Sequence, residues 1–229
     1  MLLGLQYIAH PQIMFAAVGD ATCDRVPLQV GQFESDNRMD QNLEDMILEG
    51  GGGGQKVESY ELMLYVAARH TTIDCWEKRR RKGYLFVIGD EMAYSAVSAS
   101  QVNRLIGDVL QSDVPLEQIV DEVRQRYHLY YVLPGGASHG ADAQVIQFWT
   151  RLVGEDHFIK LRDPADTSES IALAIGMREG AVSSQQGAQR MEEKGIVAKA
   201  VHGVGKMFSS LVPGATHDDP PSAKPPRRL

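Results

Sequence analysis

Three short apolar runs constrain the fold of this chain more than any other feature of its sequence. They consist mainly of aromatic and aliphatic residues and span 13–18 (IMFAAV), 84–88 (YLFVI) and 129–133 (LYYVL). A strand that is apolar at every position is typical of a parallel sheet that helices cover on both faces. We therefore expect these runs to form buried strands of one sheet. Two weaker runs, 28–33 and 157–161, are predicted to add strands, and a glycine within the first favours an edge position for it.

Six other segments carry apolar residues at helical spacing. They span residues 40–48, 58–70, 100–110, 116–126, 142–153 and 168–177. Strands that alternate with helices predict βαβ crossovers and a doubly wound sheet. The predicted fold class is therefore α/β, three-layer and doubly wound, with a mostly parallel sheet.

The predicted domain organisation follows from a change in composition near residue 180. With 229 residues, 43% of them hydrophobic, the chain is long enough for one α/β domain and a tail. We predict the domain over 1–180, a linker over 181–192, an amphipathic helix over 193–212 and a disordered, proline-rich tail over 213–229. For the amphipathic segment, packing on the domain or disorder is favoured over docking to a partner or an anionic membrane.

Charge and cysteine content narrow the possible function classes. The formal net charge of −7 argues against a general nucleic-acid-binding protein. Cys23 and Cys75 form no CxxC pair and no disulfide framework. No apolar stretch reaches the roughly 18 residues of a membrane span, and the apolar start lacks the basic region and cleavage site of a signal peptide. These features predict a cytoplasmic protein.

A run of five glycines, Gly50 to Gly54, raises the question of a phosphate or metal site. In a P-loop a strand precedes the glycines, and a final Gly-Lys-Ser/Thr follows. Here a predicted helix precedes the run, Lys56 follows Gln55, and Val57 stands where a hydroxyl residue is needed. The run is therefore not a P-loop.

Two carboxylates, Asp90 and Glu91, follow the apolar run 84–88. Carboxylates at the C-terminal edge of a parallel sheet are well placed to hold Mg²⁺ directly or through water. A divergent Mg-dependent nucleotide hydrolase that uses Asp90 and Glu91 is therefore one hypothesis for the function. The simpler interpretation is a solvated turn or a helix N-cap.

The order of the predicted elements points to a family. A strand that ends in VGDATCDR is followed by an edge strand, a helix, the glycine run, a second helix and a strand that ends Gly89-Asp90-Glu91. Over about residues 1–178 this order resembles a von Willebrand factor type A (vWA)-like domain, in which a GGGT loop precedes the third helix and a strand ending TDG follows it. The resemblance implies that Asp90 occupies a metal-ligand position. It also implies that the loop positions are held by Gly52, Gly53, Gly54 and Gln55.

The chain departs from the family at the metal-ion-dependent adhesion site. The D-x-S-x-S motif, which ends the first and central strand of the family and supplies most metal ligands, does not occur. The resemblance therefore implies an N-terminally truncated domain with a degenerate or absent metal site. Gln55 stands where the family has threonine, and its neutral amide is a weaker Mg²⁺ ligand than an anionic oxygen. We expect no cofactor and no tight Mg²⁺ binding; a micromolar affinity by titration calorimetry, abolished by Asp90→Ala, would overturn this expectation.

The resemblance implies a non-enzymatic protein-interaction module that is a component of a larger assembly. Its ligand is expected at the C-terminal edge of the sheet, at Gly52 to Gln55, Asp20, Asp90 and Glu91. Without the central strand, apolar strands would have open edges, which invite association with other chains or copies. A stable co-purifying protein would favour the module, whereas nucleotide turnover that is sensitive to Glu91→Gln would favour the hydrolase.

Two further patterns have simpler explanations. Residues 136–140 match the G-x-S-x-G elbow of α/β-hydrolases. However, Pro134 and Gly135 separate them from the preceding strand, which favours a glycine-rich loop. The basic run 77–82 (EKRRRK) favours a solvated loop over a patch for an acidic partner or for nuclear import.

Overall fold

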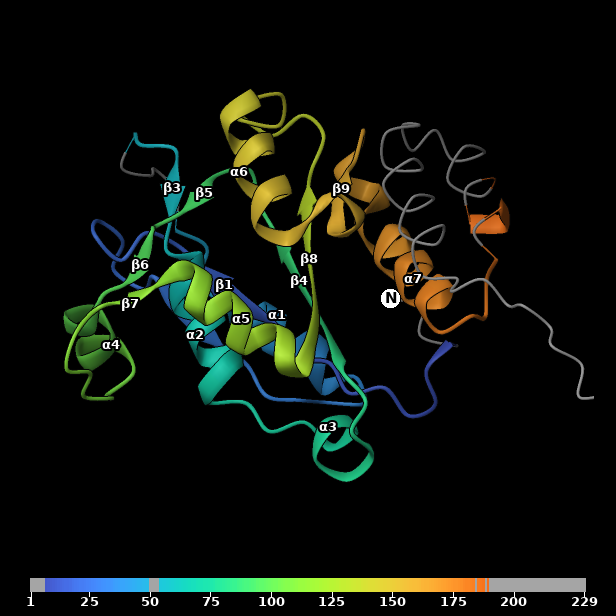
Figure 1. Ribbon diagram of the computed structural model, residues 1–229, viewed down its shortest axis with the longest axis horizontal. Coiled ribbons are helices and arrows are strands. Elements are labelled where there is room, and N and C mark those ends of the chain that lie inside the picture. Colours follow the sequence, from blue (N-terminus) through green and yellow to red (C-terminus); the bar gives the residue numbers. More distant parts are fainter. Residues whose placement is uncertain (1–6, 50–53, 184, 188, 190–229) are drawn as a thin grey trace, which may run out of the picture.

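The computed structural model describes residues 7–49, 54–183, 185–187 and 189, and these residues form a mixed α/β fold. The main sheet has three parallel strands in the order β4–β8–β9 (Figure 1). These strands span Gly83–Ile88 (β4), Tyr127–Leu133 (β8) and Phe158–Lys160 (β9). Ile88 lies opposite Val132 in the first pair, and Leu133 lies opposite Lys160 in the second. The strands predicted at 84–88, 129–133 and 157–161 are therefore confirmed, the last in shortened form.

Helices cover both faces of this sheet because the side chains of β8 alternate between two cores. Leu129, Tyr131 and Leu133 belong to the larger core. That core includes residues of α2 (Tyr60–Arg69), α5 (Leu116–Arg126) and α6 (Ala143–Val153). Tyr130 and Val132 belong to a second core, together with residues of α7 (Thr167–Arg178). Accordingly α5 and α7 lie on opposite sides of β8 (Figure 1), so the sheet has helices on both faces, as predicted.

Local sequence signals explain where α6 begins and ends. Asp142 caps its start by accepting a hydrogen bond from the backbone N–H of Gln144 at 2.8 Å. Gly154 follows its last turn with a φ of 90°, a conformation that favours glycine. The observed helix therefore matches the predicted 142–153 closely.

A separate antiparallel pair precedes the main sheet in the chain. β1 (Ala16–Val18) pairs with β2 (Leu28–Val30), and an isolated bridge joins Ile13 to Glu34. The predicted strand 13–18 is thus shorter than expected, because only its last three residues form a regular ladder. Among the described residues β2 pairs only with β1, so both are edge strands of a two-stranded sheet. The prediction that the run 13–18 joins 84–88 and 129–133 in one sheet is therefore wrong.

β8 is more deeply buried than β1 and β4, the other two strands that were expected in the core. Every residue of β8 except His128 is buried, whereas β4 is half-buried along most of its length and Ile88 is 47% exposed. Ala16 of β1 is also exposed. The prediction of burial on both faces is therefore confirmed for β8 and wrong for β1 and β4. The reason is that β8 has a neighbour on each side, while within the described residues β4 pairs only with β8 and β1 only with β2.

Two helices are shorter than their sequence patterns predict. α1 spans Arg38–Glu44 instead of 40–48 and contains no buried residue, so its apolar stripe does not contribute to the core. α4 spans Ala99–Leu105 and stops well before residue 110. Its end is marked by Gly107, which has a φ of 97°.

Several short elements have no counterpart among the sequence-based expectations. α3 (Asp74–Arg79) includes the start of the basic run, where a loop was expected. Four strands of two residues each are also unpredicted: β3 (Val57–Glu58), β5 (Met92–Ala93), β6 (Ala96–Val97) and β7 (Val114–Pro115). β3 pairs with β5 in parallel, and β6 pairs with β7 antiparallel.

The C-terminal predictions fall largely outside the described residues. Residues 185–187 and 189, within the predicted linker 181–192, are helical. The predicted helix 193–212 and tail 213–229 lie outside the described residues. In the part that the structure describes, no helix combines the length and the apolar character needed to cross a membrane.

Candidate functional site

Carboxylates gather where β1 and β4 end. Asp20 lies shortly after β1, and Asp90 and Glu91 lie shortly after β4. Glu58, at the end of β3, interacts electrostatically with both Glu91 and Asp20. The C-terminal ends of β1 and β4 therefore lie at the same side of the fold. We call these side chains the carboxylate cluster. It consists of Asp20, Asp24, Glu58, Glu61, Asp90 and Glu91.

Asp20 is the most densely hydrogen-bonded member of this cluster. Its Oδ1 accepts hydrogen bonds from the backbone N–H and the hydroxyl of Thr22, each at 2.8 Å. Its Oδ2 accepts one from the side-chain amide of Gln55 at 2.8 Å. The hydroxyl of Tyr94 lies 3.0 Å from Oδ1 and 3.1 Å from Oδ2. Asp20 is only 1% exposed, so donors from three separate segments take the place of water around the carboxylate.

The pKa of Asp20 is lowered although burial alone would raise it. Loss of solvation is the largest single influence, and it disfavours the charged form. The hydrogen bonds from Thr22, Gln55 and Tyr94 together outweigh it because they stabilise the carboxylate. Asp20 is therefore an ionised, buried link between the loop after β1, the segment before α2 and the segment after β5.

We expect Asp20→Ala to lower the free energy of unfolding at pH 7 by about 2–3 kcal/mol, because the hydrogen bonds that Thr22, Gln55 and Tyr94 donate to this charged acceptor are lost. The folded-state pKa lies below the ordinary 3.8, so this contribution is present above that pH and is lost as the pH falls. Urea unfolding at neutral and acidic pH measures the effect, with Asp40→Ala on the exposed surface of α1 as the control. An equal loss at both pH values would contradict this role.

Glu61 is buried and Glu58 is half-buried, and each has one side-chain oxygen without a hydrogen-bond partner among the described residues. Glu61 is completely buried; its Oε2 accepts the backbone N–H of Tyr94 at 3.2 Å, and its Oε1 has no partner among the described residues. Burial raises the pKa of Glu61 to about 8. Burial and the neighbouring charge of Glu91 raise the pKa of Glu58 to about 7. Two members of the carboxylate cluster, Glu58 and Glu61, therefore have pKa values near neutral pH.

Asp90 and Glu91 contact the loop that follows β8. Asp90 Oδ2 accepts the backbone N–H of His139 at 2.8 Å, and the ring Nε2 of His139 lies 3.9 Å from Glu91 Oε1. Burial and the charge of Asp90 raise the pKa of Glu91. The backbone carbonyl of Glu91 accepts the indole N–H of Trp149 at 2.7 Å and the hydroxyl of Tyr131 at 3.2 Å. The G-x-S-x-G segment, which contains His139, thus serves as a loop that supports this carboxylate pair.

The structure separates the predicted edge residues into two groups. Asp20 and Gln55 are in direct contact, whereas Asp90 and Glu91 contact the loop of His139. Gly54 has a φ of 73°, and Gly52 and Gly53 lie outside the described residues. Site residues that sequence reasoning missed are Thr22, Tyr94, Glu58 and Glu61. For the two glutamates a signal exists, since they are carboxylates at helical spacing directly after the glycine run.

Gln55 meets Asp20 as a hydrogen-bond donor and not through its oxygen. Its amide nitrogen also lies 3.1 Å from the Tyr94 hydroxyl. Among the residues that the structure describes, no set of three or more His, Cys, Asp or Glu side chains is arranged to hold a metal ion. The role of Asp90 as a metal ligand, like the expected weakness of Mg²⁺ binding, stays a prediction.

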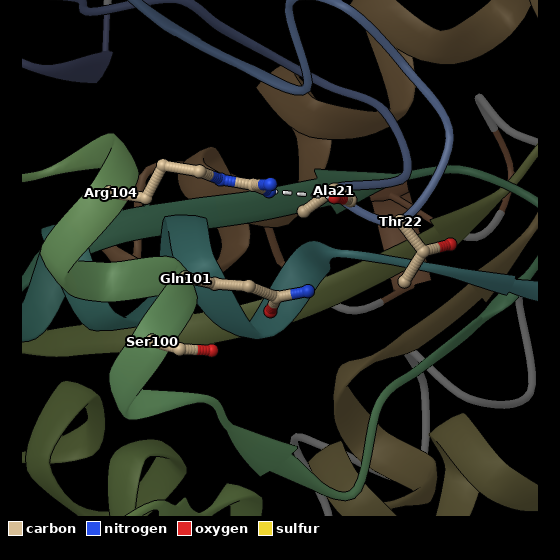
Figure 2. A pocket seen from close by; sticks show the side chains of 5 residues that line it. All are labelled: Ala21, Thr22, Ser100, Gln101 and Arg104. Atoms are coloured by element: carbon tan, nitrogen blue, oxygen red, sulfur yellow. Dashed lines mark hydrogen bonds between the residues drawn. The ribbon is translucent and has the colours of Figure 1, made fainter.

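A polar cleft of about 340 Å³ adjoins the Asp20 loop. Figure 2 shows Ser100, Gln101 and Arg104 of α4 facing Ala21 and Thr22 across this cleft. The guanidinium of Arg104 donates a hydrogen bond to the backbone carbonyl of Ala21 at 2.8 Å. This contact ties the loop that carries Asp20 to α4.

Comparisons with known proteins found no match: no protein-family model, no curated protein and no solved structure is similar to this chain. The function is therefore inferred from the geometry of the described residues.

Proposed function

We propose that this chain is a non-enzymatic protein-interaction module and a component of a larger assembly. The observation that carries the proposal is the apolar edge of β4 with which no described residue pairs. A partner that contacts this edge also meets the carboxylate cluster, because Asp90 and Glu91 directly follow the strand.

β4 lacks the features with which soluble proteins protect a strand edge. Such edges are usually short, charged, interrupted by proline or covered by another element. The six residues of β4, GYLFVI, include no charge and no proline, and in the described part of the chain this strand pairs only with β8. β9, at the other edge of the sheet, is only three residues long and ends in Lys160. The difference between the two edges of one sheet favours a binding role for the β4 edge.

The proposal includes a vWA-like, Rossmann-type fold without the first strand of that family. Its support is the order of elements, in which the antiparallel β1–β2 pair is followed by α2 and then by parallel β4, β8 and β9. The contact between Asp20 and Gln55 at the carboxyl edge is consistent with a ligand-facing surface there. The free thiols of Cys23 and Cys75 suit the reducing cytoplasm that we propose as its location.

Electrostatics favours this module over the nucleotide hydrolase. The edge carries the carboxylate cluster, and the neighbouring Lys56 is already paired with Asp142. Like charges repel, so the phosphates of a nucleotide are disfavoured at this edge unless cations accompany them. A protein surface with basic groups is attracted instead.

A photo-crosslinking amino acid placed at Ile88 tests the proposal in cells that normally make the protein. We expect a discrete adduct with another protein, because Ile88 is an exposed apolar residue on β4, whose second edge pairs with no described strand. Val109, an exposed apolar residue outside the sheet, is the matched control position and should give no such adduct. Equal labelling at both positions, or none at Ile88, would overturn the proposal.

A further inference from the structure

We propose that the partner contributes one extended, apolar segment, which binds as a strand between β1 and β4. The segment runs parallel to β4 and carries basic residues at the end that meets the carboxylate cluster. This inference rests on the proposed function and specifies the form of its partner.

The backbone of β4 offers a regular row of hydrogen-bonding groups at its free edge. The N–H of Gly89, just after β4, donates to the carbonyl of Val132 in β8 at 3.2 Å. Because backbone groups point to opposite edges at successive residues of a strand, those of Tyr84, Phe86 and Ile88 point away from β8. No described residue forms a backbone hydrogen bond with these outward groups.

β1 presents a second free edge by the same reasoning. The carbonyl of Phe15 accepts the N–H of Gly31 at 2.9 Å, so the residues at 15 and 17 face β2. The backbone groups of Met14, Ala16 and Val18 therefore point to the other side, where no described residue forms a backbone hydrogen bond with them.

The two free edges belong to one site because β1 and β4 share a core and a direction. Met14 and Val18 from β1 and its approach pack on the same core as Leu85 and Val87 of β4. Both strands also end at the carboxylate cluster. A strand that lies between them and runs the same way would continue the parallel pairing of β4, β8 and β9.

Charge defines the ends of the incoming segment. The exposed basic residues 78–82 directly precede β4, and some of them are already paired, as Arg81 is with Glu179. The carboxylate cluster follows β4. Electrostatic complementarity therefore favours an acidic residue at the start of a parallel segment and basic residues at its end. Strand addition of this type takes its affinity from main-chain hydrogen bonds.

Fluorescence anisotropy of the purified full chain with synthetic peptides tests the inference. The probe is EEVYVTVIKK, and we expect saturable binding. The reversed-charge peptide KKVYVTVIEE and the proline peptide EEVYPTPIKK should each bind at least about tenfold more weakly, because one loses charge complementarity in the parallel direction and the other loses backbone donors. Tighter binding of KKVYVTVIEE would overturn the parallel direction, and equal binding of the proline peptide would overturn strand addition.

Two protein variants locate the binding position. Ile88→Pro removes an outward N–H while keeping the bonds to β8, and we expect it to bind about tenfold more weakly than Ile88→Ala, which shortens the same side chain but keeps the N–H. Ala16→Pro should also weaken binding, with Ala16→Ser as its control. An effect of Ile88→Pro without any effect of Ala16→Pro would overturn the position between the two strands.

A homodimer in light scattering that Ile88→Pro dissociates would overturn the choice of partner, because a second copy would then occupy the edge.

Peptide binding and photo-crosslinking at Ile88 together separate this inference from the proposed function. If no peptide binds but the adduct at Ile88 forms, strand addition is wrong and the interaction module stands. If the adduct is also absent, both proposals are wrong.

Discussion

Replacing Trp149 by alanine is expected to lower the free energy of unfolding by about 3–5 kcal/mol. Trp149 is completely buried on α6, stacks on Tyr131 with ring centroids 4.0 Å apart, and meets Tyr60 edge-on at 5.6 Å. Its indole N–H also donates to the backbone carbonyl of Glu91. The substitution therefore opens a cavity against β8 and leaves the backbone carbonyl of Glu91 with one hydrogen bond fewer.

The other tryptophan of the chain supplies a matched control. Trp76 lies half-buried on α3 and contacts Arg80 through its ring face, so Trp76→Ala should cost less than half as much. Trp149→Phe should lie between the two, since it keeps an aromatic ring but loses the donor to Glu91. Urea unfolding followed by far-ultraviolet circular dichroism measures all three variants. A loss below about 1 kcal/mol for Trp149→Ala would show that α6 does not anchor the sheet.

Replacing Glu61 by glutamine is expected to stabilise the protein at alkaline pH by on the order of a few kcal/mol. Burial raises the folded-state pKa of Glu61 from an ordinary 4.5 to about 8. Between these values the folded chain holds a proton that the unfolded chain releases, so stability falls as the pH rises through this window. Glutamine stays neutral and keeps an oxygen for the N–H of Tyr94. The free energy of unfolding should therefore fall less with rising pH in the variant.

Urea unfolding at several pH values between about 4 and about 9, a range that brackets the two pKa values, measures this difference. We expect similar stabilities at the acidic end and a clear advantage for Glu61→Gln at the alkaline end. Glu117→Gln, an exposed change on α5, is the control and should follow the natural protein throughout. Parallel profiles for the Glu61 variant and the natural protein would mean that Glu61 does not hold its proton in the folded state.

The elements of the main sheet could be predicted because their sequence signals are local. A continuous apolar run marks β8, and apolar residues at helical spacing mark α5 and α6 closely. The short strands such as β3 and β5 could not be found, because two residues carry no periodicity. α1 was misplaced because its apolar residues have helical spacing and yet no core to contact.

The candidate site was predicted only in part, for a similar reason. Asp20, Asp90 and Glu91 stood out because they follow recognisable strands, and Gln55 stood out through the family resemblance. Tyr94 carries no local signal, although it contacts both Asp20 and Gln55. Contacts between residues so distant along the chain arise from the packing of separate segments, which a single sequence does not specify.

The sequence by itself determined the α/β class, the parallel strands and the placement of carboxylates after β4, because apolar patterning and residue order act locally. Only the tertiary structure decided which strands have neighbours on both sides. Burial of an apolar strand depends on segments far away in the chain, and the same composition is buried in β8 but half-exposed in β4. The tertiary structure likewise decided the ionised state of Asp20 and the raised pKa of Glu61. Each depends on whether donors from distant segments reach a buried carboxylate.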